Sequence, residues 1–218
     1  MDENVPSNFR PMSNLPFLSK VLERVILRQL FAHLSSTGLH PVFHSANRKE
    51  HSTETAVLKV FSDIVDDMDK GEFVLLSLLD LSAAFDTVDH DILLHRMSTS
   101  FGVSGDVLLW FKSYLIGRSQ SVYLPTGSSV KRAVTIGVPQ GSVLCPILFT
   151  LYIADIGRLV SSFGLKHHCY ADDTQIHGRC SLTDCDNLKS EMLGRIQSVE
   201  QWISSNRLRL NLAKSEFM

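Results

Sequence analysis

Apolar positions repeat with helical spacing in the first third of the chain. From position 14 to position 34 they recur every three to four residues, and Gly38 and Pro41 follow. This pattern predicts one core-facing helix that ends before the glycine. The apolar positions of this predicted helix are Leu18, Val21, Leu22, Val25, Ile26 and Leu30.

A second helix is predicted over positions 51–71. The cap sequence "STET" precedes the apolar repeat, and Gly71 closes it. One face of this helix is apolar, and two further residues widen that face. The face consists of Ala56, Val60, Ile64 and Met68, with Val57 and Phe61 beside them.

A continuous apolar run, "EFVLLSLLDL" at 72–81, has the length of a strand and is bounded by Gly71 and small residues. It predicts a buried central strand that ends at or near Asp80. The later patterns predict helices at 90–97, 105–117 and 188–206, and a loop that becomes a helix over 139–160. They predict strands at 119–125 and 131–138, and two short strands within 165–177. Because these elements lack a regular βαβ repeat, the fold class is α+β.

Composition fits a globular domain. The 218 residues are 44% hydrophobic and 20% charged, which suits one compact domain or part of a larger one. The formal net charge is −2, with 21 Lys and Arg against 23 Asp and Glu, so no global attraction draws the chain to a polyanion. Binding to nucleic acid would have to be local.

The four cysteines show no regular framework, and the N-terminal residues lack the pattern of a signal peptide. We therefore expect a reducing intracellular compartment. No apolar run approaches the length of a membrane span, so no membrane partner is expected. A zinc site could draw on Cys180, Cys185, His167, His168 and His177, but the absence of a Cys-x-x-Cys pair disfavours it.

Two pairs of adjacent aspartates occur in the chain. Asp66 and Asp67 fall in the predicted second helix, where the pattern predicts solvated charge on its polar side. Asp172 and Asp173, in "CYADDTQ", fall at the turn between two predicted strands. An acidic pair by itself therefore indicates little about function.

Asp80 changes this picture. A lone carboxylate at the end of an apolar strand is costly to bury and needs a partner. Asp172 lies 92 positions further on, so the three carboxylates cannot form a local calcium loop, and the fold must bring them together. An all-oxygen site would suit Mg²⁺, and two such ions would support phosphoryl transfer. The alternative is a capped turn and a buried aspartate bonded to backbone amides.

Several ordered blocks then resemble one family. "LLDLSAAFDTVDH", "GVPQGSVLCPILFTLYI" and "YADD" resemble the reverse transcriptase motifs of non-LTR (LINE-type) retrotransposons, and the match extends to "NFRPMSNL", "NRKEHSTETA", "WFKSYLIGRSQ" and "RLRLNLAKSE". These look like the blocks of jockey-like or chicken-repeat-like elements. The resemblance implies a right-hand polymerase fold with partial fingers (about 1–71 and 95–135) and a palm (about 72–94 and 136–218) in one domain, its antiparallel sheet packed on helices.

The resemblance also implies roles for individual residues. Asp80, Asp172 and Asp173 match the metal-binding carboxylates, and Lys214 matches the lysine that protonates the leaving pyrophosphate. The residues matching nucleotide- or template-binding positions are Phe85, Gln140, Gly141, Arg10 and Arg48. Core packing is the alternative for Phe85, and a surface position is the alternative for each arginine. The implied cofactor is a pair of Mg²⁺ ions, with Mn²⁺ as a substitute, and the implied partners are an RNA template, a DNA primer and dNTPs in the nucleus.

Other residues of these blocks are expected to have structural roles. Asp86 and Asp89 should serve the local turn, with solvent exposure or helix capping as the alternative. Lys112 and Arg118 could support a nucleic-acid backbone, although their helix is expected to pack Trp110 and Leu115 into the core.

The sequence departs from the family pattern at Asn47, where an aromatic is usual, and at Cys145, where glycine is usual. Relative to the family, the chain begins just before "NFRP" and ends four residues after Lys214, so we expect truncation at both ends, with no thumb and no endonuclease. Two functions follow from this comparison. One is a polymerase fragment, and the other is a silent copy that at most binds nucleic acid or a protein partner.

Overall fold

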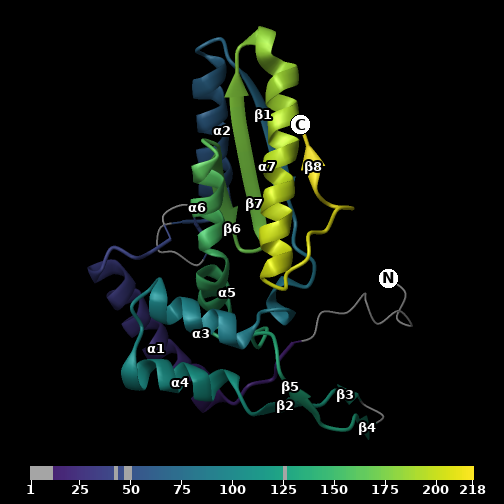
Figure 1. The fold of residues 1–218 in the computed structure, drawn as a ribbon. Helices are drawn as coiled ribbons and strands as arrows, with labels where there is room; N and C mark the ends of the chain where they lie inside the picture. The colour runs from purple at the N-terminus through teal and green to yellow at the C-terminus, as the bar shows by residue number, and fades with distance from the viewer. Residues whose placement is uncertain (1–11, 42–43, 47–50, 125–126) are drawn as a thin grey trace.

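The computed structural model describes residues 12–41, 44–46, 51–124 and 127–218. Its centre is a four-stranded sheet in the order β6-β7-β1-β8 (Figure 1). The strands are β1 (Phe73–Leu79), β6 (Lys166–Tyr170), β7 (Asp173–Cys180) and β8 (Glu216–Phe217). Every neighbouring pair is antiparallel. The predicted α+β class is confirmed.

The helices cover both faces of this sheet. Helix α2 (Thr53–Met68) packs on one face, and α6 (Asp155–Ser162) and α7 (Cys185–Ser205) lie on the other (Figure 1). Below the sheet in Figure 1 lie α1 (Phe17–Ser36), α3 (His90–Thr99) and α4 (Gly105–Leu115), with α5 (Cys145–Ile153) between them and α6. The short 3₁₀ turns are η2 (Ala84–Asp86) and η3 (Leu182–Asp184).

Two small antiparallel ladders form a separate projection. They pair β2 (Arg118–Gln120) with β5 (Arg132–Val134), and β3 (Tyr123–Leu124) with β4 (Gly127–Ser128). The strands predicted at 119–125 and 131–138 are confirmed only in part. The second one ends at Val134, because Gly137 takes a φ of +87° and turns the backbone towards Val88.

Helix α5 forms the centre of the core. Eight of its nine residues are buried, which explains its uninterrupted apolar sequence. The 18 residues Cys145–Ser162 are long and apolar enough for a membrane span, so the prediction that no run approaches that length was wrong. In the fold this stretch divides into α5 and α6, and 56% of it is buried inside the protein, as expected of a core helix.

Helix α1 contradicts the prediction of a core-facing apolar stripe. Its N-terminal apolar residues Leu18, Val21, Leu22 and Val25 are exposed, whereas Leu30 and Leu34 are buried. The buried side of the first turns carries Glu23, which accepts hydrogen bonds from the Ser19 hydroxyl and the Val143 amide. A charged residue therefore occupies the position that apolar spacing alone would assign to a core side chain. On α2, the buried residues Ala56 and Val60 agree with the prediction, whereas Val57, Phe61 and Met68 are exposed.

The prediction of solvated charge was also wrong for Asp67. Its carboxylate is fully buried and pairs with Lys166 at 2.6 Å, Arg179 at 3.1 Å and Lys70 at 3.5 Å. Burial alone would raise the pKa of Asp67, but hydrogen bonding and charge from Lys166, with Arg179 and Lys70, hold it below its usual range. Asp67 thus joins α2 to β6 and β7, while Asp66 remains exposed as predicted.

Four histidines on or beside the sheet are also buried: His44, His167, His168 and His177. Burial lowers the pKa of His44 and of His167 to about 4, and it lowers the pKa of His168 and His177 as well. Neither ring nitrogen of His177 has a hydrogen-bond partner among the described residues. The folded protein therefore holds these rings neutral.

Stability should fall as the pH is lowered from neutrality. An unfolded histidine takes up a proton near pH 6.5, whereas His44 and His167 do so in the fold only near pH 4. The unfolded state binds more protons between these values, so stability present above pH 6.5 is lost on acidification, by about 1.4 kcal/mol per unit of pKa difference. Urea unfolding at about pH 7.5 and about pH 5 measures this. A double His44→Gln/His167→Gln variant should show a smaller shift, and identical wild-type midpoints at both pH values would contradict the expectation.

Candidate active site

The hairpin between β6 and β7 brings the acidic pair to the end of β1. Ladder pairing runs from Phe73↔Cys180 to Leu79↔Thr174, so Asp80 and Asp173 follow as the next positions of their two strands. Ala171 and Asp172 form the two-residue turn, and Ala171 takes a φ of +54°. Such a turn normally uses glycine at this position, so the backbone here stores strain of the kind found at functional sites.

The three carboxylates influence one another electrostatically. The pKa of Asp173 is raised, first by partial desolvation and then by the charges of Asp172 and Asp80, while Lys214 opposes the shift. Gathering like charges in this way favours a bound cation. Among the residues that the structure describes, no three acidic, histidine or cysteine side chains already surround one metal position. The oxygen-only donor set nevertheless fits a hard divalent cation.

Asp80 is oriented by the segment that follows α7. The side-chain amide of Asn211 donates to Oδ2 of Asp80 at 2.7 Å, and the Asn211 backbone amide donates to the Asp80 carbonyl at 2.8 Å. Nζ of Lys214 lies 4.0 Å from the same Oδ2, and its side chain is 66% exposed. The structure therefore brings Lys214 to the carboxylates. It also adds Asn211, whose only sequence signal was its place in the block "NLAKSE".

A second group of predicted residues lies around η2. The half-buried ring of Phe85 packs on Phe149, with ring centroids 4.8 Å apart. The Val138 amide donates to the Phe85 carbonyl at 2.8 Å, which fixes the loop before α5 against η2. Nε2 of Gln140 donates to Oδ2 of Asp86 at 2.9 Å.

Asp86 thus holds the "PQG" loop, a contact 54 positions away that the prediction of a local turn role did not include. The Asp89 carboxylate caps α3 by accepting from the amides of Asp91 and Ile92, which is the alternative given for it, and it also pairs with Arg207 at 3.2 Å.

The "PQG" sequence forms a tight turn. The Ser142 amide donates to the Pro139 carbonyl at 3.0 Å, and Gly141 at the third position has a φ of +87°. A turn with positive φ at this position requires glycine. The Gln140 carbonyl also accepts from the Ser13 amide at 2.8 Å, so residues on both sides hold the loop. The predicted positions of Gln140 and Gly141 are therefore rigid.

The remaining predicted residues are placed differently. Arg10 and Arg48 lie outside the described residues, as does Asn47. Cys145 is buried at the start of α5, where burial raises the pKa of its thiol to about 12, so it is held as an unreactive thiol. The sulfur atoms of Cys180 and Cys185 lie 3.7 Å apart, but no zinc-like group of ligands surrounds them within the described ranges.

Of the other block residues, Phe111 and Leu115 are buried in the core, while Trp110 is half-buried.

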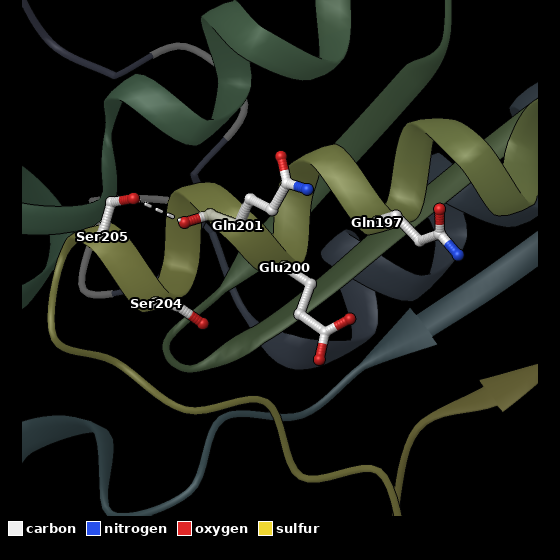
Figure 2. Close-up of a pocket in the computed structure, with 5 residues that line it drawn as sticks. All are labelled: Gln197, Glu200, Gln201, Ser204 and Ser205. Atoms are coloured by element: carbon white, nitrogen blue, oxygen red, sulfur yellow. Dashed lines mark hydrogen bonds between the residues drawn. The ribbon is translucent and has the colours of Figure 1, made fainter.

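A shallow hollow lies along the exposed side of α7. Figure 2 shows its lining, in which the Ser205 hydroxyl donates to the Gln201 carbonyl at 2.8 Å. The lining residues are Gln197, Glu200, Gln201, Ser204 and Ser205. None of them is a predicted site residue.

An antiparallel sheet that is packed on helices and presents acidic residues at the end of β1 and in the β6–β7 turn is the palm arrangement of a right-hand nucleotide polymerase. A family model described as reverse transcriptase (RNA-dependent DNA polymerase) matches residues 2–218. The chain belongs to this family, and its resemblance to non-LTR reverse transcriptases is confirmed. Members of the family generally use divalent metal ions.

Relatives with curated names come from mobile elements. The chain is 29% identical over 215 residues to the RNA-directed DNA polymerase from mobile element jockey of Drosophila melanogaster, covering 95% of this chain and 23% of that protein. It is 33% identical over 191 residues to the probable RNA-directed DNA polymerase from transposon X-element of the same species, covering 86% of this chain and 21% of that protein. The chain thus spans about a quarter of the length of these relatives.

Solved telomerase structures share the fold. The telomerase of Candida albicans, solved with a fragment of telomeric RNA, superposes with a TM-score of 0.68 at 13% identity, covering 93% of this chain and 35% of that one. The apo telomerase of Candida tropicalis gives a TM-score of 0.63 at 11% identity, covering 92% of this chain and 37% of that one. These values confirm the prediction of a right-hand fold with palm and partial fingers.

Proposed function

We propose that this chain carries the catalytic core of an RNA-directed DNA polymerase of a non-LTR retrotransposon, which extends a DNA primer with dNTPs on an RNA template. The observation that carries the proposal is the placement of Asp80 and Asp173 at adjacent positions of β1 and β7, with Asp172 in the turn and Lys214 beside Asp80. Residues separated by 92 positions meet at one end of one sheet. Because these carboxylates repel one another, their placement does not stabilise the fold, which favours a functional role for them.

Asp80, Asp172 and Asp173 would hold two Mg²⁺ ions, with Mn²⁺ as a possible substitute. Bound there, the ions would activate the attacking hydroxyl and stabilise the leaving phosphate oxygen. The protein's own contribution is to keep the carboxylates oriented, and Asn211 does this for Asp80. Lys214 is exposed and cationic, so its ammonium group can donate a proton to the leaving pyrophosphate.

The second group would position the nucleotide. Phe85, five positions after Asp80, would pack against the sugar, and its contact with Phe149 keeps the ring in place. Gln140 and Gly141 would lie along the base. Because Gly141 has no side chain, the base could approach the backbone of the turn closely. Arg10 and Arg48 would contact the triphosphate or template. The division into fingers (1–71 and 95–135) and palm (72–94 and 136–218) belongs to the same proposal.

Primer extension on an RNA template with Mg²⁺ tests this function. The wild-type chain should incorporate dNTPs, and Asp172→Ala should not, since the variant loses one of the three carboxylates. Equal incorporation by the two proteins would contradict the catalytic role. Absence of incorporation by both would favour the alternative, a silent copy that at most binds nucleic acid or a protein partner.

Replacing Asn211 with alanine should weaken activity without abolishing it. The substitution removes the 2.7 Å hydrogen bond to Oδ2 of Asp80 but leaves the backbone contact that holds the segment. Loss of a residue that orients a metal ligand typically costs about 10- to 100-fold in metal affinity or activity. The Mg²⁺ concentration for half-maximal primer extension should rise accordingly. Asn187→Ala on the exposed side of α7 is the control, and an unchanged Mg²⁺ dependence in Asn211→Ala would contradict the orienting role.

A further inference from the structure

The two small ladders form a projection that the site described above does not use. We define residues 118–124 and 127–134 as the ribbon. It comprises β2, β3, β4 and β5, and it extends away from α3 and α4 at the lower right of Figure 1. Its described side chains are mostly exposed. A projection with so little core of its own contributes little to stability, and its side chains are available for contact.

The charged residues in and around the ribbon are all positive. Positions 107–154 contain Lys112, Arg118, Lys131 and Arg132 but no Asp or Glu, whereas the whole chain has a net charge of −2. Three of these four cations belong to the ribbon. A local cationic surface on an acidic chain is what binding to a polyanion would require.

The strand register places cations on one face of the ribbon. Residues directly opposite each other in an antiparallel pair point to the same side, and alternate residues share a side. Arg118 pairs with Val134, and Gln120 pairs with Arg132, so Arg118, Gln120 and Arg132 share one face. Arg118 is held in place, because its guanidinium lies over the Tyr114 ring at 5.2 Å and donates to the Tyr114 carbonyl at 3.3 Å.

Exposed apolar and aromatic side chains accompany these cations. Tyr123 is 79% exposed, Val130 is 71% exposed and Val122 is 61% exposed. An exposed aromatic ring on the same projection as cations is a combination that suits unpaired nucleic acid, since bases can stack on the ring while phosphates contact the cations. A duplex, whose bases are already stacked, would not use Tyr123 in this way.

The ribbon also leads away from the candidate nucleotide site. Directly after β5, Ile136 forms a bridge with Asp89, the Gly137 amide donates to the Val88 carbonyl at 2.7 Å, and the Val138 amide donates to the Phe85 carbonyl at 2.8 Å. The base of the ribbon is therefore fixed to η2 and to the "PQG" loop.

From this charge, exposure and position, we propose that the ribbon binds the unpaired RNA template strand outside the catalytic site, through Arg118 and Arg132 on the phosphates and Tyr123 on a base. The choice of RNA rests on the proposed function, whereas the binding itself needs neither metal nor dNTP. The proposal can therefore fail while primer extension succeeds, and the reverse also holds.

Fluorescence anisotropy with a labelled single-stranded RNA of about 20 nucleotides, titrated at several salt concentrations, tests the ribbon. The Arg118→Ala/Arg132→Ala variant should bind about tenfold more weakly, and the slope of log K against log salt should become smaller in magnitude by about 1.4, corresponding to two lost phosphate contacts. Tyr123→Ala should also weaken binding about tenfold but leave the slope unchanged. Arg132 and Tyr123 are exposed and Arg118 is half-buried, so the fold should be retained, and circular dichroism verifies this.

A matched control is Lys189→Ala/Arg158→Ala, which removes the same two charges from exposed positions on α7 and α6. This variant should bind RNA as the wild type does. Several outcomes would overturn the proposal: no wild-type binding at low salt, unchanged binding by the ribbon variants, or equal losses in ribbon and control variants. Ribbon-dependent binding of single-stranded DNA but not RNA, or equally tight binding of polyglutamate, would overturn the assignment of the partner.

Discussion

Replacing Asp80 with asparagine is expected to reduce primer extension by about 10³-fold or more, because a metal-binding carboxylate contributes several kcal/mol to transition-state stabilisation. The substitution preserves size and removes one of three mutually repelling charges, so the unfolding midpoint should not fall. Single-turnover extension with saturating dNTP measures the loss.

Asp66→Asn is the matched control for this variant, since it removes the same charge from an exposed position on α2. It should extend primers at the wild-type rate. Wild-type rates in Asp80→Asn would exclude a catalytic role for this carboxylate.

The Arg96→Met variant should lose about 3–5 kcal/mol of stability, enough to unfold a marginal domain. The buried Arg96 guanidinium donates to the Tyr152 carbonyl and to the Asn206 side chain, and it pairs with Asp155 at 3.2 Å. It thereby connects α3, α5, α6 and the end of α7. Methionine fills similar volume but removes the donor from the Tyr152 carbonyl and from the Asn206 side-chain oxygen, both of which are buried.

Arg158→Met provides the comparison, because Arg158 pairs with the same Asp155 at 3.5 Å but is 74% exposed. Its loss should cost no more than about 1 kcal/mol. Urea unfolding of both variants measures the difference. Equal stability of the two would show that Arg96 does not connect these helices energetically.

Much of the palm was predictable because its signals are local. The apolar run of β1 has no helical alternative of sufficient length, and Asp80 marks its end. The two strands around "YADD" were equally predictable from the sequence, since a two-residue turn joins them and the acidic residues lie at that turn. Once these two elements were assigned, the meeting of Asp80 with Asp173 followed from antiparallel pairing.

The misassigned residues depend on contacts that are distant in sequence. Asp67 has the sequence pattern of a surface residue within its helix. Its burial is favourable chiefly because Lys166 and Arg179, about 100 positions away, pair with it. Asn211 lies 131 positions from Asp80, and Asp86 lies 54 positions from Gln140. Helical spacing also could not predict that the first apolar residues of α1 are exposed. The opposite side of these turns is buried because the Glu23 carboxylate accepts a hydrogen bond from the amide of Val143, which is 120 positions away.

Titration of Mn²⁺ against the protein, with free Mn²⁺ followed by electron paramagnetic resonance, tests the central claim most directly because it depends on neither primer nor template. The wild-type chain is expected to bind Mn²⁺ saturably, since the raised pKa of Asp173 reflects the neighbouring charges of Asp172 and Asp80 as well as desolvation. Asp173→Asn should weaken this binding at least about tenfold, and Asp66→Asn should not. Equal Mn²⁺ affinity in the wild type and Asp173→Asn would contradict a metal site at the acidic hairpin.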